Sequence, residues 1–160
     1  MSKENEEAAS DWLIVVGAVL LFSSLFLTWS HQVSPHLLIL FGHTATLSGV
    51  PRDPTAWQVY STSDVVLTLV AAALGAAALF GSHRARLLVA LVALLALAFV
   101  VHALAVPPTN GVLLSLGHGY LQTGASAGPG ETLALVGLLV ALGGLGLSFV
   151  SDRAPTAAVA

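Results

Sequence analysis

Four long apolar stretches dominate the pattern of hydrophobic and polar positions along this chain. They run over Trp12–Trp29, Val65–Gly81, Leu87–Val106 and Thr132–Val150. An α-helix rises 1.5 Å per residue, so about 20 apolar residues cross the roughly 30 Å hydrocarbon core of a bilayer. The pattern therefore predicts four membrane-spanning helices that form an all-α transmembrane bundle.

The connections between these stretches differ greatly in length. The turn Ser82–Arg86 is short and predicts an antiparallel pair of the second and third spans, whereas residues 30–64 and 107–131 form two long connections. Loops of that length usually carry function or a small fold of their own. We divide the chain into an N-terminal segment (1–11), a transmembrane domain (12–150) and a disordered tail (151–160).

The two long connections resemble each other. The apolar run 37–43, which ends in Gly42-His43, has a counterpart at 113–118, which ends in Gly117-His118. An apolar run followed by a Gly-containing turn and a second short run is typical of a β-hairpin. We expect the two connections to pair as a small extracytoplasmic sheet that caps the bundle.

The end of the first long connection predicts a short interfacial helix. Trp57, Tyr60 and Asp64 are spaced so that they fall on one helical face. Asp64 directly precedes the second apolar stretch, where a cap or first-turn carboxylate would satisfy free N–H groups and complement the helix dipole. The alternative role of Asp64 is that of a binding carboxylate beside the two aromatic side chains.

Aromatic and small residues indicate how the helices are anchored and packed. Trp12 and Trp29 bracket the first stretch, as headgroup-level anchors do. Small residues at i, i+4 spacing favour close helix contacts, and they occur as Ala71/Gly75, Gly137/Ala141 and Gly144/Ser148. The alternative for the Gly137, Ala141 and Gly144 side is a homodimer contact.

Composition and charge agree with a membrane location. The 160 residues are 56% hydrophobic and 8% charged, against about 25% charged residues in soluble domains. If both termini are cytoplasmic, Lys3, Arg84, Arg86 and Arg153 lie inside and only Arg52 lies outside, as the positive-inside rule requires. We expect a multi-pass protein of the plasma membrane (the bacterial inner membrane) with an uncleaved first span, because the segment before it is acidic.

The sequence contains no catalytic motif. It has no cysteine, no Gly-x-Ser-x-Gly elbow, no His-Glu-x-x-His pair and no phosphate-binding Gly-rich Lys loop. We therefore expect a non-enzymatic protein without a cofactor. A net charge of −3 without a basic patch also argues against nucleic acid as a partner.

Histidines are the one enriched polar type. His43 and His118 occupy matching places in the two long connections and are candidate ligands of an extracytoplasmic metal site, since converging imidazoles bind zinc or copper. Ordinary polar loop residues are the simpler interpretation. His102 lies near the end of the third span, where an ionisable group is a functional candidate or a hydrogen-bonding partner of a neighbouring helix.

Two segments carry a resemblance to a known group of proteins. Ala56–Asp64 fits Ala-Trp-x-x-Tyr/Phe-Ser-x-x-Asp, and Thr132–Gly144 contains Leu-Ala-Leu-Val-Gly. In these segments the chain resembles small four-span membrane proteins of high-GC bacteria, which have no assigned activity. Its outline is also similar to claudin-like and tetraspan proteins, although their loop cysteines are missing.

Function is therefore predicted by elimination. We expect a structural or interaction subunit that contacts the lipid bilayer and associates with itself or with a larger membrane complex. The alternatives are a small pore or carrier that acts as an oligomer and an extracytoplasmic metal-binding protein. The residues that we expect to carry structure or interaction are Trp57, Tyr60, Asp64, Gly75, His102, Gly137 and Gly144.

Overall fold

A computed structural model of the chain describes residues 3–31, 46–47, 50–51, 53–59, 62–107 and 126–151. Within them lie four long helices, α1 (Lys3–Ser24), α4 (Ser63–Phe80), α5 (His83–Ala105) and α7 (Pro129–Ser151). Each is long and apolar enough to cross a membrane. The predicted all-α fold is confirmed, and the architecture fits a multi-pass membrane protein.

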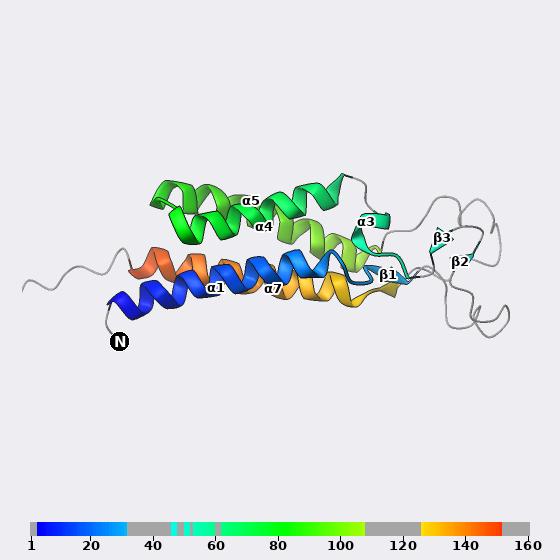
Figure 1. Ribbon diagram of the computed structural model, residues 1–160, viewed down its shortest axis with the longest axis horizontal. Coiled ribbons are helices and arrows are strands. Elements are labelled where there is room, and N and C mark those ends of the chain that lie inside the picture. The colour runs from blue at the N-terminus through cyan, green and yellow to red at the C-terminus, as the bar shows by residue number, and fades with distance from the viewer. Residues whose placement is uncertain are drawn as a thin grey trace, which may run out of the picture.

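The four helices lie side by side and alternate in direction (Figure 1). α1 packs against α4 and α7, and α5 packs against the same two helices. The turn between α4 and α5 lies at the same end as the start of α1 and the end of α7, and we call this end the turn end. The strands β1 (Ser30–His31) and β4 (Ser126–Ala127) lie at the opposite end, which we call the sheet end.

The most extensive helix contact joins α1 and α7. A Cβ atom on Gly17 would lie 2.5 Å from both the Ala141 nitrogen and the Gly137 oxygen, and one on Gly144 would lie 2.8 Å from the Ser10 oxygen. Backbone thus meets backbone, as small residues allow in membrane helices. Gly137 and Gly144 thus lie in a close helix contact within the chain, and α1 occupies the side on which a homodimer contact was the alternative.

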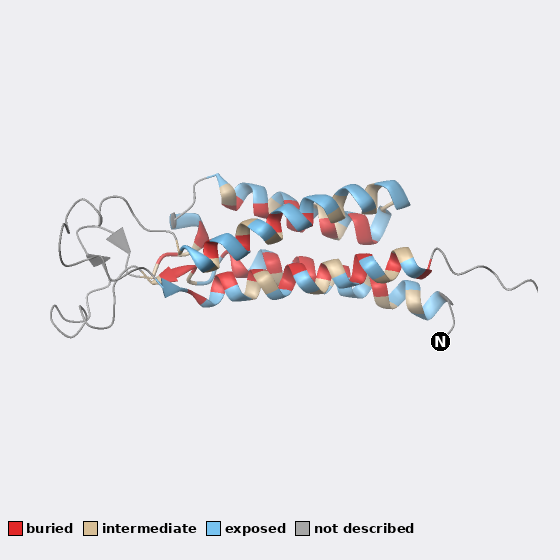
Figure 2. Ribbon diagram, turned by 180° about the vertical axis from the view of Figure 1, so that it is seen from behind, coloured by how far each residue is buried: buried red, intermediate tan, exposed pale blue. Residues whose placement is uncertain are grey.

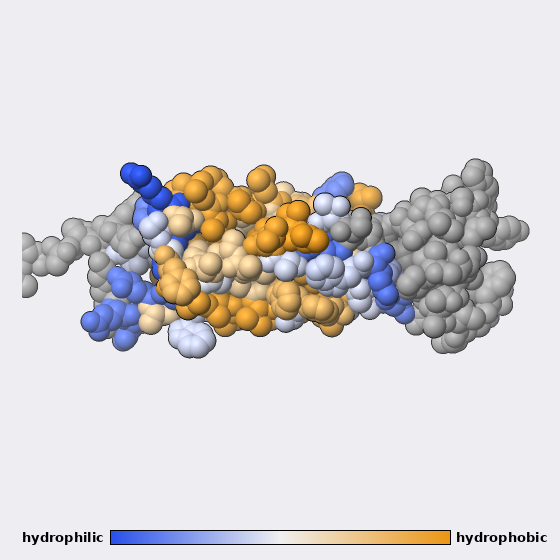
Figure 3. Space-filling view, turned by 45° about the horizontal axis from the view of Figure 1, so that its top comes forward, coloured by the Kyte–Doolittle hydropathy of each residue, from blue (hydrophilic) through white to orange (hydrophobic). Residues whose placement is uncertain are grey.

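Apolar residues from all four long helices form the core. The buried residues lie on the sides of the helices that face one another (Figure 2). α5 contributes only small residues, namely Ala93, Ala96, Val100 and Ala103. Large apolar side chains point outward instead, among them Leu69, Leu95 and Leu139. The face shown in Figure 3 therefore carries a wide apolar belt, with hydrophilic residues towards both of its ends.

Helix boundaries differ from the predicted spans at several ends. α1 begins at Lys3, so the segment 1–11 is almost entirely helical and continues into the span, with Glu4 and Glu6 favourably placed in the first turn. α5 begins at His83 because the Ser82 hydroxyl accepts a hydrogen bond from the Ala85 N–H (3.4 Å). The predicted turn 82–86 is thereby shortened to Gly81 and Ser82.

At the sheet end, short strands pair the two long connections with each other. β1 pairs antiparallel with β4, with Ser30 opposite Ala127 and His31 opposite Ser126. The two connections therefore pair with each other, as expected, at the residues next to α1 and α7. A second antiparallel pair joins β2 (Thr46–Leu47) to β3 (Val50–Pro51) inside the first connection. The apolar runs 37–43 and 113–118 lie outside the described residues, and the cap that they would build stays a prediction.

The predicted short helix is present as α3 (Ala56–Val59). Its start is fixed by a reciprocal pair of hydrogen bonds between Thr55 and Gln58. The Thr55 N–H donates to Gln58 Oε1, and the Gln58 N–H donates to the Thr55 carbonyl, both at 3.0 Å. The Gln58 side chain thus supplies one half of a capping box, while the Gln58 N–H bonds to the main chain of Thr55 and not to its hydroxyl.

Candidate functional site at the sheet end

The chain that leaves α1 forms the centre of the sheet end. The Trp29 N–H donates to the Pro54 carbonyl (3.0 Å), and the Trp29 carbonyl accepts from the Gly128 N–H (2.8 Å). An isolated bridge also joins Thr28 to Thr55. One short segment therefore holds together the stretch before α3 and the start of α7.

Trp29 is fully buried, so its predicted place as a headgroup-level anchor is wrong. α1 ends at Ser24, and the indole Nε1–H donates to the Ser24 carbonyl at 2.8 Å. The free carbonyls at a helix end need such a donor. The indole ring lies against Gly130, where any side chain would collide with it. The ring therefore closes the end of α1 against the start of α7.

Two carboxyl groups are buried at this end. Asp64 in the first turn of α4 and Glu131 in the first turn of α7 have no exposed surface, and their carboxyl oxygens have no hydrogen-bond partner among the described residues. The Gly128 N–H interacts electrostatically with Glu131 but donates its hydrogen bond to Trp29. A first-turn position favours negative charge, which offsets part of the cost of burial.

The predicted arrangement around Asp64 is not formed. α3 ends at Val59 and α4 begins at Ser63, so Trp57 and Asp64 lie on separate helices. Trp57 is 43% exposed and packs near Phe26, with ring centroids 6.3 Å apart, whereas Asp64 is buried. Asp64 occupies the first turn as expected, but its carboxyl group makes no capping hydrogen bond. Tyr60 lies outside the described residues.

The histidines do not converge in the described part of the chain. His31 Nδ1 lies 2.6 Å from Asp53 Oδ1 and ties β1 to the stretch before α3. His102 is exposed on α5. Among residues that the structure describes, no three His, Cys, Asp or Glu side chains come together as a metal site. His43 and His118 lie outside this part, so the metal site stays a prediction.

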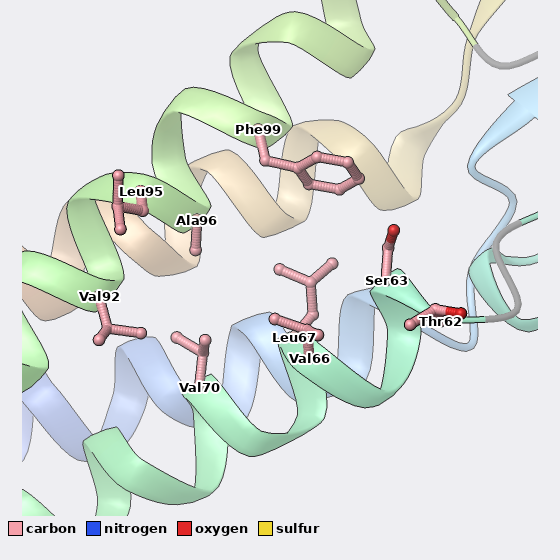
Figure 4. Close-up of a pocket in the computed structure, with 9 residues that line it drawn as sticks. All are labelled: Thr62, Ser63, Val66, Leu67, Val70, Val92, Leu95, Ala96 and Phe99. Carbon is pink, nitrogen blue, oxygen red and sulfur yellow. The ribbon is translucent and has the colours of Figure 1, made fainter.

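An apolar groove of about 310 Å³ runs between α4 and α5 (Figure 4). Its walls include Leu67 and Val70 from α4 and Leu95 and Phe99 from α5, and Thr62 and Ser63 lie where α4 begins. None of the described residues that line it is titratable. Such an apolar surface suits contact with apolar side chains or with lipid chains.

The glycines predicted to mediate helix contacts fall into two groups. Gly137 and Gly144 lie in the α1–α7 contact, together with Gly17, which the small-residue pattern does not identify. A Cβ atom on Gly75 would meet nothing within 4 Å. Gly75 is therefore not used by the packing of the described helices.

Comparison with known protein families, with curated proteins and with solved structures finds no match. The resemblance to four-span proteins of high-GC bacteria accordingly stays a prediction.

Trp29 and Trp57 provide a matched pair of stability tests. Trp29→Ala removes a fully buried ring and the donor to Ser24, and we expect it to lower the free energy of unfolding by about 3 kcal/mol or more. Trp57→Ala removes a half-exposed ring and should cost about 1 kcal/mol or less. Chemical unfolding in detergent measures the free energy of unfolding of both variants. Equal losses in the two variants would show that the Trp29 ring does not hold the sheet end together.

Asp64 tests whether an unpartnered carboxyl group is tolerated or used. Asp64→Leu replaces a buried polar group that lacks a hydrogen bond, and we expect it to raise the free energy of unfolding by about 1 kcal/mol. Asp64→Asn keeps a polar group in place and should change stability less. A clear loss of stability in Asp64→Leu would mean that the carboxyl group has a partner beyond the described residues.

Proposed function

We propose that this chain is a non-enzymatic protein of the bacterial plasma membrane, which works as a structural or interaction subunit by associating with another membrane helix. The observation that carries the proposal is a set of unused glycines. Gly75 on α4 and Gly143 and Gly146 on α7 would each accept a Cβ atom with nothing within 4 Å.

The physical argument concerns what a glycine costs and what it permits. Glycine inside a helix is less favourable than alanine by about 0.5–1 kcal/mol. In a membrane it permits close approach of a second helix, where dispersion contacts stabilise association. Gly17, Gly137 and Gly144 are used in this way within the fold, whereas Gly75, Gly143 and Gly146 have no such contact among the described residues.

Gly143 and Gly146 form the better-defined surface. They lie one turn apart on α7, both are exposed, and Leu139 and Val150 flank them with exposed apolar side chains. A flat backbone strip between apolar side chains fits a helix of a second copy or of a larger membrane complex. Lipid alone would be served equally well by alanine or leucine.

Leucine substitutions separate association from folding. We expect Gly143→Leu with Gly146→Leu to leave thermal unfolding of the monomer unchanged, because both positions are open, but to reduce recovery of partners at least severalfold. Gly144→Leu should instead impair folding, since Ser10 and Ile14 lie against that position. The measurement is mild-detergent pull-down of the tagged chain with mass spectrometry and size analysis.

The result that would overturn association is also defined. If the unaltered chain is recovered alone and monomeric, while liposomes that contain it pass an ion or a solute, the pore or carrier alternative replaces it. Wild-type recovery of the same partners by the double variant would show that the Gly143 and Gly146 surface is not the contact.

Orientation gives an independent prediction. With both termini cytoplasmic, the sheet end faces outward and the turn end faces the cytoplasm. The chain contains no cysteine, so single cysteines report cleanly. In intact cells Ser126→Cys should react with an impermeant maleimide and Ser82→Cys should react only after permeabilisation. The reverse pattern would overturn the orientation.

A further inference from the structure

The groove between α4 and α5 is open on the outer surface of the bundle. Val66 from α4 and Val92 and Leu95 from α5 line it, and these three side chains are exposed, whereas Leu67 and Ala96 lie buried in its wall. In a membrane this surface faces hydrocarbon. An empty hollow there forfeits dispersion contacts, and water would find too few polar partners in it. Apolar material therefore fills the groove.

The groove has the length and the level of part of one membrane leaflet. Because α4 and α5 are antiparallel, Ser63 lies across the groove from Phe99, and Val70 lies across from Val92 (Figure 4). Seven residues on each helix correspond to about 10 Å. One leaflet contributes about half of the roughly 30 Å hydrocarbon core. The groove starts in the first turn of α4, so it extends from the edge of the span at the sheet end toward the middle of the bilayer.

A hydroxyl group stands at the outer end of this apolar groove. The Ser63 hydroxyl points into the space between α4 and α5, whereas the Thr62 hydroxyl points away from it (Figure 4). The Thr62 side chain makes no capping hydrogen bond, and the Ser63 hydroxyl has no hydrogen-bond partner among the described residues. A serine hydroxyl can donate to a carbonyl oxygen. One donor at the edge of the span and apolar walls beyond it suit an amphiphile.

The size of the groove argues against a helix as its occupant. A helix with its side chains is 10–12 Å wide, so a 10 Å length of it takes up about 800 Å³ or more. The groove offers about 310 Å³. No glycine is among the described residues that line it, so a second helix would not find bare backbone here as it does at Gly143 and Gly146. An extended hydrocarbon chain is narrow enough to enter.

We infer that the groove binds one acyl chain of a glycerophospholipid from the leaflet at the sheet end, and that the ester carbonyl of this chain accepts a hydrogen bond from the Ser63 hydroxyl. The chain fills the space between α4 and α5, whose contact is less extensive than that of α1 and α7. A ligand that binds only the folded state stabilises it. The inference depends on a membrane location but not on the association proposed above.

Two neighbouring valines provide a matched test of the groove. Val65 and Val66 are 49% and 52% exposed, but only Val66 lines the groove. The purified full chain is mixed in mild detergent with dioleoyl phosphatidylglycerol, and native mass spectrometry measures the retained lipid. We expect one retained lipid per chain. Val66→Trp should reduce its retention about fivefold or more, because the indole ring takes the place of the acyl chain and its dispersion contacts. Val65→Trp should leave retention unchanged.

The ester contact has its own test. A diester phospholipid is compared with the diether phospholipid that has the same chains and headgroup but no ester carbonyl. The unaltered chain should retain the diester about threefold to tenfold better, which is the effect of one hydrogen bond. Ser63→Ala should abolish this preference. Thr62→Val should keep it, since the Thr62 hydroxyl points away from the groove (Figure 4).

A variant on the opposite wall protects the test from misfolding. If Val66→Trp does not fold, Val92→Trp fills the groove from α5 and should reduce lipid retention in the same way. Its control is Leu91→Trp, because Leu91 is exposed but does not line the groove.

Three results would overturn the inference. The first is unchanged lipid retention in a folded Val66→Trp or Val92→Trp variant. The second is an equal loss in Val65→Trp, which would indicate unspecific lipid around the bundle. The third is equal retention of diester and diether lipid by the unaltered chain. Gly143→Leu with Gly146→Leu should keep the bound lipid, so this inference and the association proposal fail separately.

Discussion

The arrangement of this bundle depends on the backbone contact between α1 and α7. At Gly17 and Gly137 the helices approach so closely that a Cβ atom on either would lie less than 3 Å from the backbone of the other helix. Because membrane helices gain little from hiding apolar surface from lipid, such close dispersion contacts are a main source of their association. The same two helices are joined again at the sheet end, where Trp29 packs on Gly130.

This first helix pair explains the looser position of α4 and α5. α4 packs on α1 and α5 packs on α7, but these contacts are less extensive, and a groove remains between α4 and α5. α5 turns alanines inward at Ala93, Ala96 and Ala103 and leucines outward. Soluble proteins show the opposite pattern, since water drives their large apolar side chains inside. In lipid the small side chain belongs at the contact and the large one can face the bilayer.

The inverted pattern also explains what the sequence could and could not predict. Apolar length identifies the four spans, because any apolar helix of that length suits a bilayer. The inward face of each helix is harder to predict from the sequence, because leucines do not distinguish it from the outward face. Gly137 and Gly144 belong to small pairs at i, i+4 and were predicted to lie in a contact. Gly17 has Leu13 and Leu21 at those positions, so the same rule passes over it.

The ends of the helices were predicted less well than their centres, because hydrogen bonds decide where a helix stops. Trp29 is a residue type that is common at membrane interfaces, but its hydrogen bond to the Ser24 carbonyl and the space at Gly130 hold it inside the protein. α7 begins at Pro129, before the predicted start at Thr132, although Pro129 in the first turn and Glu131 two residues later are typical of a helix N-terminus.

Polar groups are accordingly confined to the two ends, and they serve different purposes there. At the sheet end, main-chain hydrogen bonds to Trp29 connect three separate segments, and the buried Asp64 and Glu131 benefit from the helix termini. At the turn end the Asp11–Arg86 pair links α1 to α5 through side chains alone and leaves donors and acceptors unused. Between the ends the core holds no charged residue among those described. Among the described residues, charged side chains therefore lie at the two ends of the bundle, and helix packing holds its middle together.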